Sequence, residues 1–291
     1  MKDYFGYKDE TVVVTGAASG MGKAATEMLV DLGAKVYALD WNEVEVEGIE
    51  KYVHVDLSNK DSIDEAFKVI PEKIDSFFGI AGVSGSKNDF MTTVSIDFIA
   101  NKYITENYLY DRMSDGAIAY ITSTGGNGWD DEDNIPFYKS ACEAKTWDDV
   151  IEEINKTGFQ YMPGTMGYPF AKLALNYYTS FINKKFNEKG IRVNALLPNA
   201  TVTGMLDEFT DMAKANGQDI MNSTGNAGRL AESREMGEPV VFLNSDMASY
   251  ISGEHLFVDY GQNGEEEIGV REPLLISLKG IQQMMAAHAK K

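Results

Sequence analysis

The sequence predicts an α/β fold in which a doubly wound parallel sheet of about seven strands is covered by helices on both faces. The first observation is that short runs of β-branched and aromatic residues alternate with longer stretches of helical periodicity, which is the pattern of βαβ units. The second is that these runs are almost continuously apolar, as expected for strands that are buried on both faces.

The predicted elements alternate through most of the chain. We expect strands at residues 10–16, 34–40, 51–57, 75–82, 116–124, 191–198 and 254–261. Helices are expected at residues 20–32, 61–70, 95–113, 168–189 and 234–248. Parallel strands joined in this way have right-handed connections, which places helices on both faces. Because no repeat, long linker or change of composition precedes residue 262, residues 1–291 are expected to form a single domain.

Two segments do not fit a minimal alternating fold. Residues 129–166 form an acidic, loop-like insertion before the helix at 168–189. A helix is expected within it at 147–156, where four apolar residues share one face: Trp147, Val150, Ile151 and Ile154. Residues 262–291 form a C-terminal extension that ends in another expected helix. We expect both segments to be solvated surface elements, and a lid or a subunit contact is the alternative.

Composition and charge exclude several classes of partner. The chain has 291 residues, 44% of them hydrophobic, and no apolar run long enough for a membrane helix. Its net charge of −19 would repel a nucleic acid or an anionic membrane, so we expect neither partner. The three histidines, His54, His255 and His288, match no metal-binding motif, and no metal site is expected.

The sequence also indicates a cellular location. The N-terminal residues carry charges where a secretory signal would be apolar. The single cysteine, Cys142, cannot form an intramolecular disulfide. We therefore expect a cytoplasmic protein.

A glycine-rich turn separates the first expected strand from the first expected helix. Gly16, Gly20 and Gly22 permit a tight turn and a close approach of the backbone to a ligand. The start of the following helix presents free N–H groups to an anion such as a pyrophosphate, and Ser19 and Met21 share this turn. Its position between a strand and a helix predicts a dinucleotide-binding, Rossmann-like domain.

Acidic residues end the next two expected strands. Asp40 can accept hydrogen bonds from both hydroxyls of an adenosine ribose, and it would repel a 2′-phosphate. Its neighbour Trp41 is not a cation, so NAD is the expected cofactor rather than NADP. Asp56, followed by Leu57, is expected at the adenine, although a helix cap shared with Ser58 explains the aspartate nearly as well.

Tyr168 and Lys172 lie four residues apart in the sequence GYPFAKLAL. On a helix they project from one face, where the lysine would lower the pKa of the phenol and make it a possible acid or base. Such pairs are common on helices, so the spacing alone predicts little.

Several motifs in a fixed order favour a catalytic role for Tyr168 and Lys172. Together these motifs resemble the short-chain dehydrogenase/reductase family over residues 8–261. They are TGAASGMG at 15–22, an acid at 40, AGVSG at 81–85, ITS at 121–123, YxxxK at 168–172 and PN followed by threonine at 198–203. Within this family the chain resembles the 3α-hydroxysteroid dehydrogenase/carbonyl reductase group in the position and length of its insertion at 129–166.

The resemblance implies a role for each matching residue. Tyr168 would exchange a proton with the substrate oxygen, Lys172 would lower the phenol pKa and hold the nicotinamide ribose, and Ser123 would donate a hydrogen bond to that oxygen. The cofactor surface would also include residues from the ends of the fourth and sixth strands: Ala81, Gly82, Pro198, Thr201 and Thr203.

Three positions depart from the family pattern. Ile80 stands where the family has asparagine before AG, and Asn199 stands where it has glycine after proline. Asp97 occupies the position of an asparagine that helps to hold a water in the proton path. Its carboxylate would change the electrostatics near Lys172, and the proton relay is the part of the mechanism most affected.

The insertion 129–166 lies where the hydroxysteroid dehydrogenase group carries extra helical residues. There the insertion obstructs a common helix-to-helix subunit contact, so the resemblance implies a homo-oligomer with an unusual assembly. The segment 204–230 is the expected substrate wall, with apolar candidates from it and from the insertion: Met205, Leu206, Phe209, Met212, Met221, Trp129 and Tyr161. Packing onto the domain explains these residues equally well.

The expected function is therefore an NAD-dependent enzyme that interconverts a secondary alcohol and an apolar ketone, with a hydroxysteroid or bile acid as substrate. One alternative is a polyol, sugar or other carbonyl substrate for the same chemistry. The other is a dinucleotide-binding regulator without catalysis, an alternative left open by Asp97.

Overall fold

The computed structural model describes residues 3–273 and 275–288, and its centre is one parallel sheet in the order β3-β2-β1-β4-β5-β6-β9. All six strand pairs are parallel. The strands are β1 (Thr11–Thr15), β2 (Lys35–Asp40), β3 (Lys51–His54), β4 (Ser76–Gly79), β5 (Ala117–Ile121), β6 (Arg192–Pro198) and β9 (His255–Val258). The predicted fold class is therefore confirmed, and each strand lies within its predicted segment.

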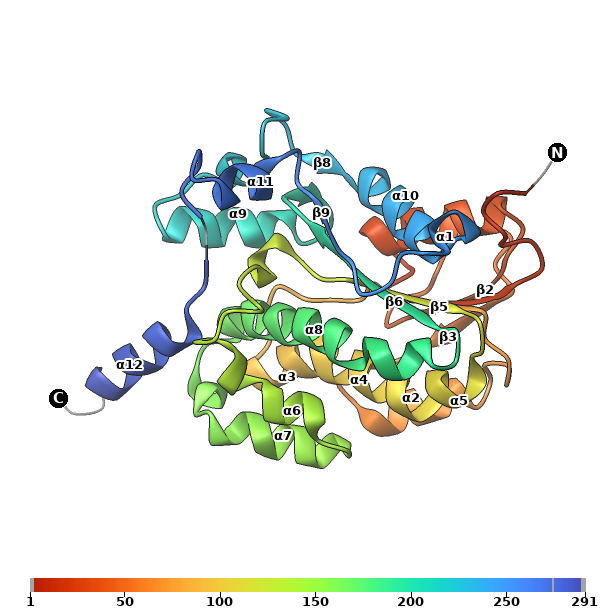
Figure 1. Ribbon diagram of the computed structural model, residues 1–291, viewed down its shortest axis with the longest axis horizontal. Helices are drawn as coiled ribbons and strands as arrows, with labels where there is room; N and C mark the ends of the chain where they lie inside the picture. Colours follow the sequence, from red (N-terminus) through yellow and green to blue (C-terminus); the bar gives the residue numbers. More distant parts are fainter. Residues whose placement is uncertain (1–2, 274, 289–291) are drawn as a thin grey trace.

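Two helices cover one face of the sheet, α1 (Gly20–Asp31) and α10 (Ser233–Asn244) (Figure 1). They pack closely because Gly237 of α10 lies against Ala25 of α1, where a Cβ on the glycine would be 3.0 Å from the Ala25 nitrogen. The apolar core on this face is formed by these helices and by alternate residues of the strands, among them Val12, Val14 and Val36.

The other face carries α2 (Lys60–Phe67), α8 (Gly164–Asn187) and one long helix over residues 90–112. That helix is α3 (Phe90–Val94), α4 (Ala100–Ile104) and α5 (Tyr110–Arg112), joined by π-helical turns at Ser95–Ile99 and Thr105–Leu109. It begins earlier than predicted, as does α8. The start of α8 is glycine-rich because Gly164 and Gly167 lie against the backbone of residues 85–90, where no Cβ would fit.

The insertion adds a layer beneath this second face (Figure 1). It contains α6 (Lys139–Glu143) and α7 (Trp147–Lys156), so the helix predicted at 147–156 is confirmed. The expectation of a solvated surface element is wrong here. Tyr138, Cys142 and Phe159 are fully buried in the core, and Trp147 packs edge-on against Tyr103 of α4 at 5.6 Å between ring centroids.

The remaining elements follow β6 and β9. A small sheet pairs β7 (Thr201–Val202) with β8 (Ala231–Glu232), and α9 (Leu206–Ala215) lies between them in sequence. The C-terminal extension forms α11 (Gln262–Glu267) and α12 (Leu278–His288). Leu278 is fully buried, and its N–H donates to Asn134 of the insertion at 2.8 Å. The insertion and the C-terminal extension, the two segments that did not fit a minimal alternating fold, therefore contact each other.

Among the residues that the structure describes, no helix combines the length and the apolar character that crossing a bilayer requires.

Candidate active site

A cavity of about 770 Å³ opens where the carboxyl ends of the central strands meet, which is the usual ligand site of such sheets. Each cofactor residue predicted from the sequence lines it: Gly16, Ser19, Gly20, Met21, Gly22, Asp40, Trp41, Asp56, Leu57, Ala81, Gly82, Tyr168, Lys172, Pro198, Thr201 and Thr203. Ser123 lines the same cavity, and Asp97 lies directly behind Lys172, fully buried.

The glycine turn has the shape of a dinucleotide cradle. Gly16 has a φ of 75°, and a Cβ there would lie 2.7 Å from the Ala81 backbone. A Cβ on Gly22 would lie 2.0 Å from the carbonyl oxygen of Gly16. Ser19 precedes α1, but its side chain accepts none of the N–H groups of the first helical turn. These donors are left for a ligand anion.

Asp40 is fixed beside this turn at the end of β2. Its carboxylate oxygens accept the N–H groups of Ala18 at 3.0 Å and Asn42 at 2.8 Å. A carboxylate has further acceptor sites, so Asp40 can still bind ribose hydroxyls. Among the cavity-lining residues, all within the described part of the chain, Lys172 is the only basic one. The residues present fit NAD and provide no cation for a 2′-phosphate.

Asp56 forms a local turn and also faces the cavity. Its Oδ1 accepts hydrogen bonds from the backbone N–H and the hydroxyl of Ser58, at 2.9 and 2.7 Å. The cap of α2 is Asn59, whose side chain accepts the N–H groups of Asp61 and Ser62. The alternative of a helix cap at Asp56 is therefore wrong, although the contact with Ser58 exists.

Tyr168, Lys172 and Ser123 meet at one wall of the cavity. The Lys172 Nζ lies 5.2 Å from the centre of the Tyr168 ring, one helical turn along α8. Ser123 follows β5, and its Oγ accepts the N–H of Gly125 at 2.9 Å, which holds the hydroxyl in place. The Ser123 hydroxyl lies beside the Tyr168 phenol and lowers its pKa. A hydroxyl pair next to a lysine can position and protonate a carbonyl oxygen.

The pKa of Tyr168 differs from the sequence expectation. Burial raises it, the charge of Lys172 and the hydrogen bond to Ser123 lower it, and the charge of Asp97 raises it again. The result is a pKa above the ordinary value of a phenol, not below it. The expected lowering by lysine is present, but desolvation exceeds it.

Asp97 explains part of that result. It lies in the π-helical turn Ser95–Ile99, a feature common at functional sites, and is fully buried. Its Oδ1 accepts the N–H of Val83 at 2.8 Å, and its Oδ2 lies 3.1 Å from the Lys172 Nζ. Burial lowers the pKa of Lys172, but Asp97 and Tyr168 raise it by more, so the ammonium is held charged.

The turn after β6 closes another side of the cavity. The Thr201 hydroxyl donates to the carbonyl of Asn199 at 2.8 Å, so this donor is used within the turn. The Thr203 Oγ accepts the N–H of Met205 at 3.3 Å, which leaves its O–H free to donate to a ligand.

The apolar substrate wall is smaller than predicted. Met205, Leu206 and Phe209 line the cavity, and the Phe209 ring lies edge-on to Tyr168 at 5.0 Å. The other candidates do not line it: Met212, Met221, Trp129 and Tyr161. Trp129 stacks on His255 at 4.3 Å instead, and Met221 and Tyr161 are exposed.

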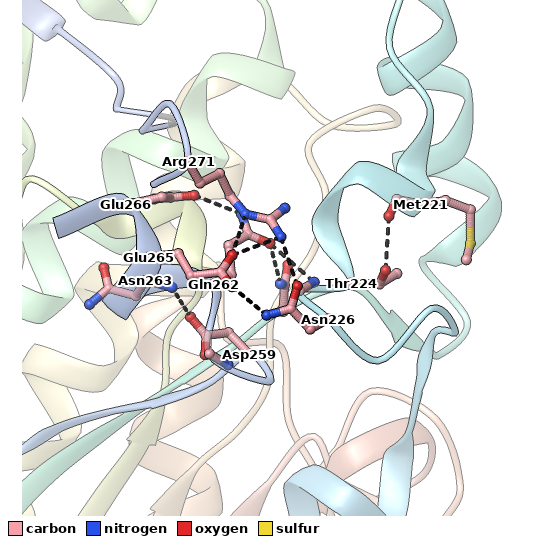
Figure 2. Close-up of polar contacts among 12 residues, drawn as sticks. Met221, Thr224, Asn226, Asp259, Gln262, Asn263, Glu265, Glu266 and Arg271 are labelled. Atoms are coloured by element: carbon pink, nitrogen blue, oxygen red, sulfur yellow. Dashed lines mark hydrogen bonds and ion pairs between the residues drawn. The ribbon is translucent and has the colours of Figure 1, made fainter. Parts of the chain in front are cut away.

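Sequence reasoning missed a polar wall on the same cavity. It comprises Asn127 after β5 and three residues of α11, namely Gln262, Asn263 and Glu266. Figure 2 shows the α11 residues next to the loop that carries Thr224 and Asn226. No motif marks this wall, because its position depends on how the chain turns after β9.

Comparison with known proteins agrees with this geometry. Residues 10–144 match the family model described as short chain dehydrogenase, and residues 155–263 match the model described as enoyl-(acyl carrier protein) reductase. The chain is 26% identical over 260 residues to coniferyl-alcohol dehydrogenase of Pseudomonas sp. (strain HR199), covering 87% of this chain and 96% of that one. It is 28% identical over 264 residues to the 3-oxoacyl-(acyl-carrier-protein) reductase FabG of Haemophilus influenzae, covering 86% and 96%.

A solved structure has the same fold. The 3α-hydroxysteroid dehydrogenase of Pseudomonas sp. B-0831, complexed with NADH, superimposes with a TM-score of 0.73 at 21% identity, over 90% of this chain and 99% of that one. The two family models together span most of the chain, in the order of its glycine turn and its tyrosine–lysine helix. The chain therefore belongs to the short-chain dehydrogenase family, as a dinucleotide-binding oxidoreductase.

Proposed function

We propose that the chain is an NAD(H)-dependent enzyme that interconverts a secondary alcohol and a ketone with an apolar body, a hydroxysteroid or bile acid being the favoured class. The observation that carries the proposal is that one cavity joins the Ser123, Tyr168 and Lys172 wall to an apolar wall formed by Met205 and Phe209. The fit of Asp40 to a free ribose, with no cation for a 2′-phosphate, supports NAD.

In this proposal each residue of the site has a separate role in the reaction. Bound NAD supplies the redox chemistry. Ser123 holds the substrate oxygen, and in the oxidative direction the Tyr168 phenolate takes its proton. Lys172 favours the phenolate through its charge, and Asp97 fixes the position of that charge. Met205, Leu206 and Phe209 bind the apolar body and keep water from the reacting oxygen.

A turnover assay tests the proposal. NAD⁺ and NADP⁺ are offered with hydroxysteroids, bile acids, polyols and simple secondary alcohols, and NADH or NADPH is followed by absorbance. We expect steroid oxidation with NAD⁺, and a loss of at least a hundredfold in Tyr168→Phe with NADH binding retained.

The other outcomes would correct the proposal in different ways. Activity on polyols alone would keep the mechanism and reject the substrate class. Preference for NADP⁺ would reject the assignment of Asp40. NADH binding without turnover of any alcohol or ketone would favour the regulator instead.

The single domain, the homo-oligomer and the cytoplasmic location stay predictions. The packing of Trp147 on Tyr103 supports an assembly that does not use the surface of α4 at this point, because α7 already covers it. Light scattering coupled to size-exclusion chromatography tests the oligomer directly.

A further inference from the structure

The wall formed by α11 is held rigidly at the end of β9. The Asp259 carboxylate accepts the N–H of Gly261 at 3.0 Å and the N–H of Asn263 at 2.6 Å, which fixes the first turn of the helix. Gly261 adopts a left-handed φ of 88°, so the chain reverses sharply into α11. Figure 2 shows Asp259, Gln262 and Asn263 at this junction.

The polar groups of this wall are largely satisfied by one another. Asn199 donates to the Gln262 Oε1 at 2.8 Å, and the Gln262 Nε2 donates to one oxygen of Glu266 at 2.8 Å. Asn127 donates to the Asn263 Oδ1 at 2.9 Å. The second carboxylate oxygen of Glu266, which lines the cavity, has no hydrogen-bond or ion-pair partner among the described residues. It is the acceptor that the wall leaves for a ligand.

The charge at this end of the cavity is negative. Asp259 and Glu266 line it, and the only basic lining residue, Lys172, is already paired with Asp97 at 3.1 Å. A carboxylate or phosphate placed here would meet no unpaired cation among the described residues that line the cavity, and Arg271, outside the lining, is paired with Glu265 of α11 at 3.1 Å. A hydroxyl or an ammonium would instead replace its lost hydrogen bond to water.

We propose that the α11 wall selects substrates that carry a hydrogen-bond donor, a hydroxyl or ammonium group, at the end away from the reacting carbon, and that Glu266 accepts that donor. This inference rests on the proposed function. Within the proposed class of hydroxysteroids and bile acids, it favours hydroxysteroids that carry a second hydroxyl or an amino group over bile acids, whose side chain ends in a carboxylate. Glu266 is a specificity residue, since the proton transfer belongs to Tyr168.

Matched substrates test the inference. The set is a monohydroxysteroid, the corresponding diol, the corresponding amino alcohol and the corresponding hydroxy acid, with cyclohexanol and cyclohexane-1,4-diol as a small pair. We expect the wild type to prefer the diol and the amino alcohol about tenfold in kcat/KM over the monohydroxysteroid. The hydroxy acid should be the poorest substrate.

Two variants of Glu266 separate charge from hydrogen bonding. Glu266→Leu should abolish both preferences, so that kcat/KM for the diol and for the amino alcohol falls to within about twofold of kcat/KM for the monohydroxysteroid in the same variant. Glu266→Gln retains an acceptor, so it should keep part of the preference for the diol and lose that for the amino alcohol. Glu272→Gln, an exposed change in the same segment outside the cavity, is the control and should keep both.

The results distinguish the two proposals. Turnover with no preference in the wild type, or preferences that survive in Glu266→Leu, would overturn this inference alone. No turnover of any alcohol in the set or in the first assay would overturn the proposed function, and this inference with it. Circular dichroism confirms that each variant is folded.

Discussion

Asp97 is one of three positions at which the sequence departs from the family pattern, and it lies against the catalytic lysine. Its carboxylate is buried against Lys172, and Gly82 makes that contact possible, since a Cβ there would lie 3.3 Å from both charged groups. The ion pair holds the ammonium in place but offsets its effect on the phenol. The two buried charges therefore act in opposite directions on Tyr168.

Removing the carboxylate should shift the pH dependence of oxidation. In Asp97→Asn the pKa of Tyr168 loses a contribution that raises it, so the phenolate forms at lower pH. We expect the ascending limb of the kcat/KM profile for alcohol oxidation, where activity rises as the phenol ionises, to move to lower pH. Asp111→Asn, an exposed change on the same long helix, is the control. An unchanged profile would show that Asp97 does not influence the reacting phenol.

The residues of the site differ in how far the sequence could predict them. The glycines and Asp40 could be assigned because their roles depend on a strand, a turn and a helix that are adjacent in the chain. The raised pKa of Tyr168 could not, because burial depends on every element around it, including Phe209 from a segment 41 residues further on. The burial of Asp97 next to Lys172 likewise depends on the packing of two distant helices.

Among the elements, α9 is held to the molecule with little burial. None of its residues is fully buried. Phe209 contacts Tyr168, and Glu208 accepts a hydrogen bond from the hydroxyl of Ser84 and pairs with Lys87 in the loop after β4. These hydrogen bonds lower the pKa of Glu208 to about 2. Glu208 therefore fastens the substrate wall to the loop after β4.

Weakening this contact should affect substrate binding more than chemistry. In Glu208→Ala, α9 loses its attachment to residues 84–87, and the apolar wall is no longer held over Tyr168. We expect KM for the steroid to rise about three- to tenfold with kcat changed less than twofold. Asp207→Asn removes the same charge from the adjacent exposed residue and should change neither. Equal losses in kcat would show that Glu208 acts on the chemical step instead.

The insertion and the C-terminal extension show where sequence patterns give too little information. The helix at 147–156 was predictable because its apolar residues recur at helical spacing. Its burial was not, because Tyr138, Cys142 and Leu278 come from separate segments that cover one another only after folding. Patterns within one element do not reveal which other element will cover it.

At the scale of the whole molecule, the carboxyl ends and the amino ends of the sheet strands carry different pockets. The carboxyl ends of the strands form the cavity, while at the amino ends a smaller pocket is lined by four acids, Glu10, Asp75, Asp115 and Asp246. Burial raises the pKa of Glu10 to about 7, and the charges of Asp75 and Asp246 add to the effect. The unfolded chain would ionise this group near its ordinary pKa of about 4.3.

This difference makes stability depend on pH. Because the folded pKa exceeds the unfolded one, the folded state binds the proton more tightly, and stability falls as pH rises from about 4.5 to about 7. Allowing for solvent screening, the loss is about 1 kcal/mol. Glu10→Gln should therefore raise Tm by about 2–4 °C at pH 8 and leave it unchanged at pH 4.5, measured by calorimetry. Exposed Glu47→Gln is the control, and equal melting of Glu10→Gln and wild type at pH 8 would contradict the assignment.

The position of the α11 wall has a consequence for how this enzyme can diversify. Every residue assigned to the cofactor and to the proton transfer lies before position 204, whereas the α11 residues of the polar wall lie between positions 262 and 266. During synthesis, the residues of the dinucleotide site are therefore translated first, and the α11 residues that contact the substrate are translated near the end of the chain. Recombination at a single point after β9 would therefore exchange the α11 part of the substrate site between relatives and leave the inherited chemistry and the apolar wall before β9 intact.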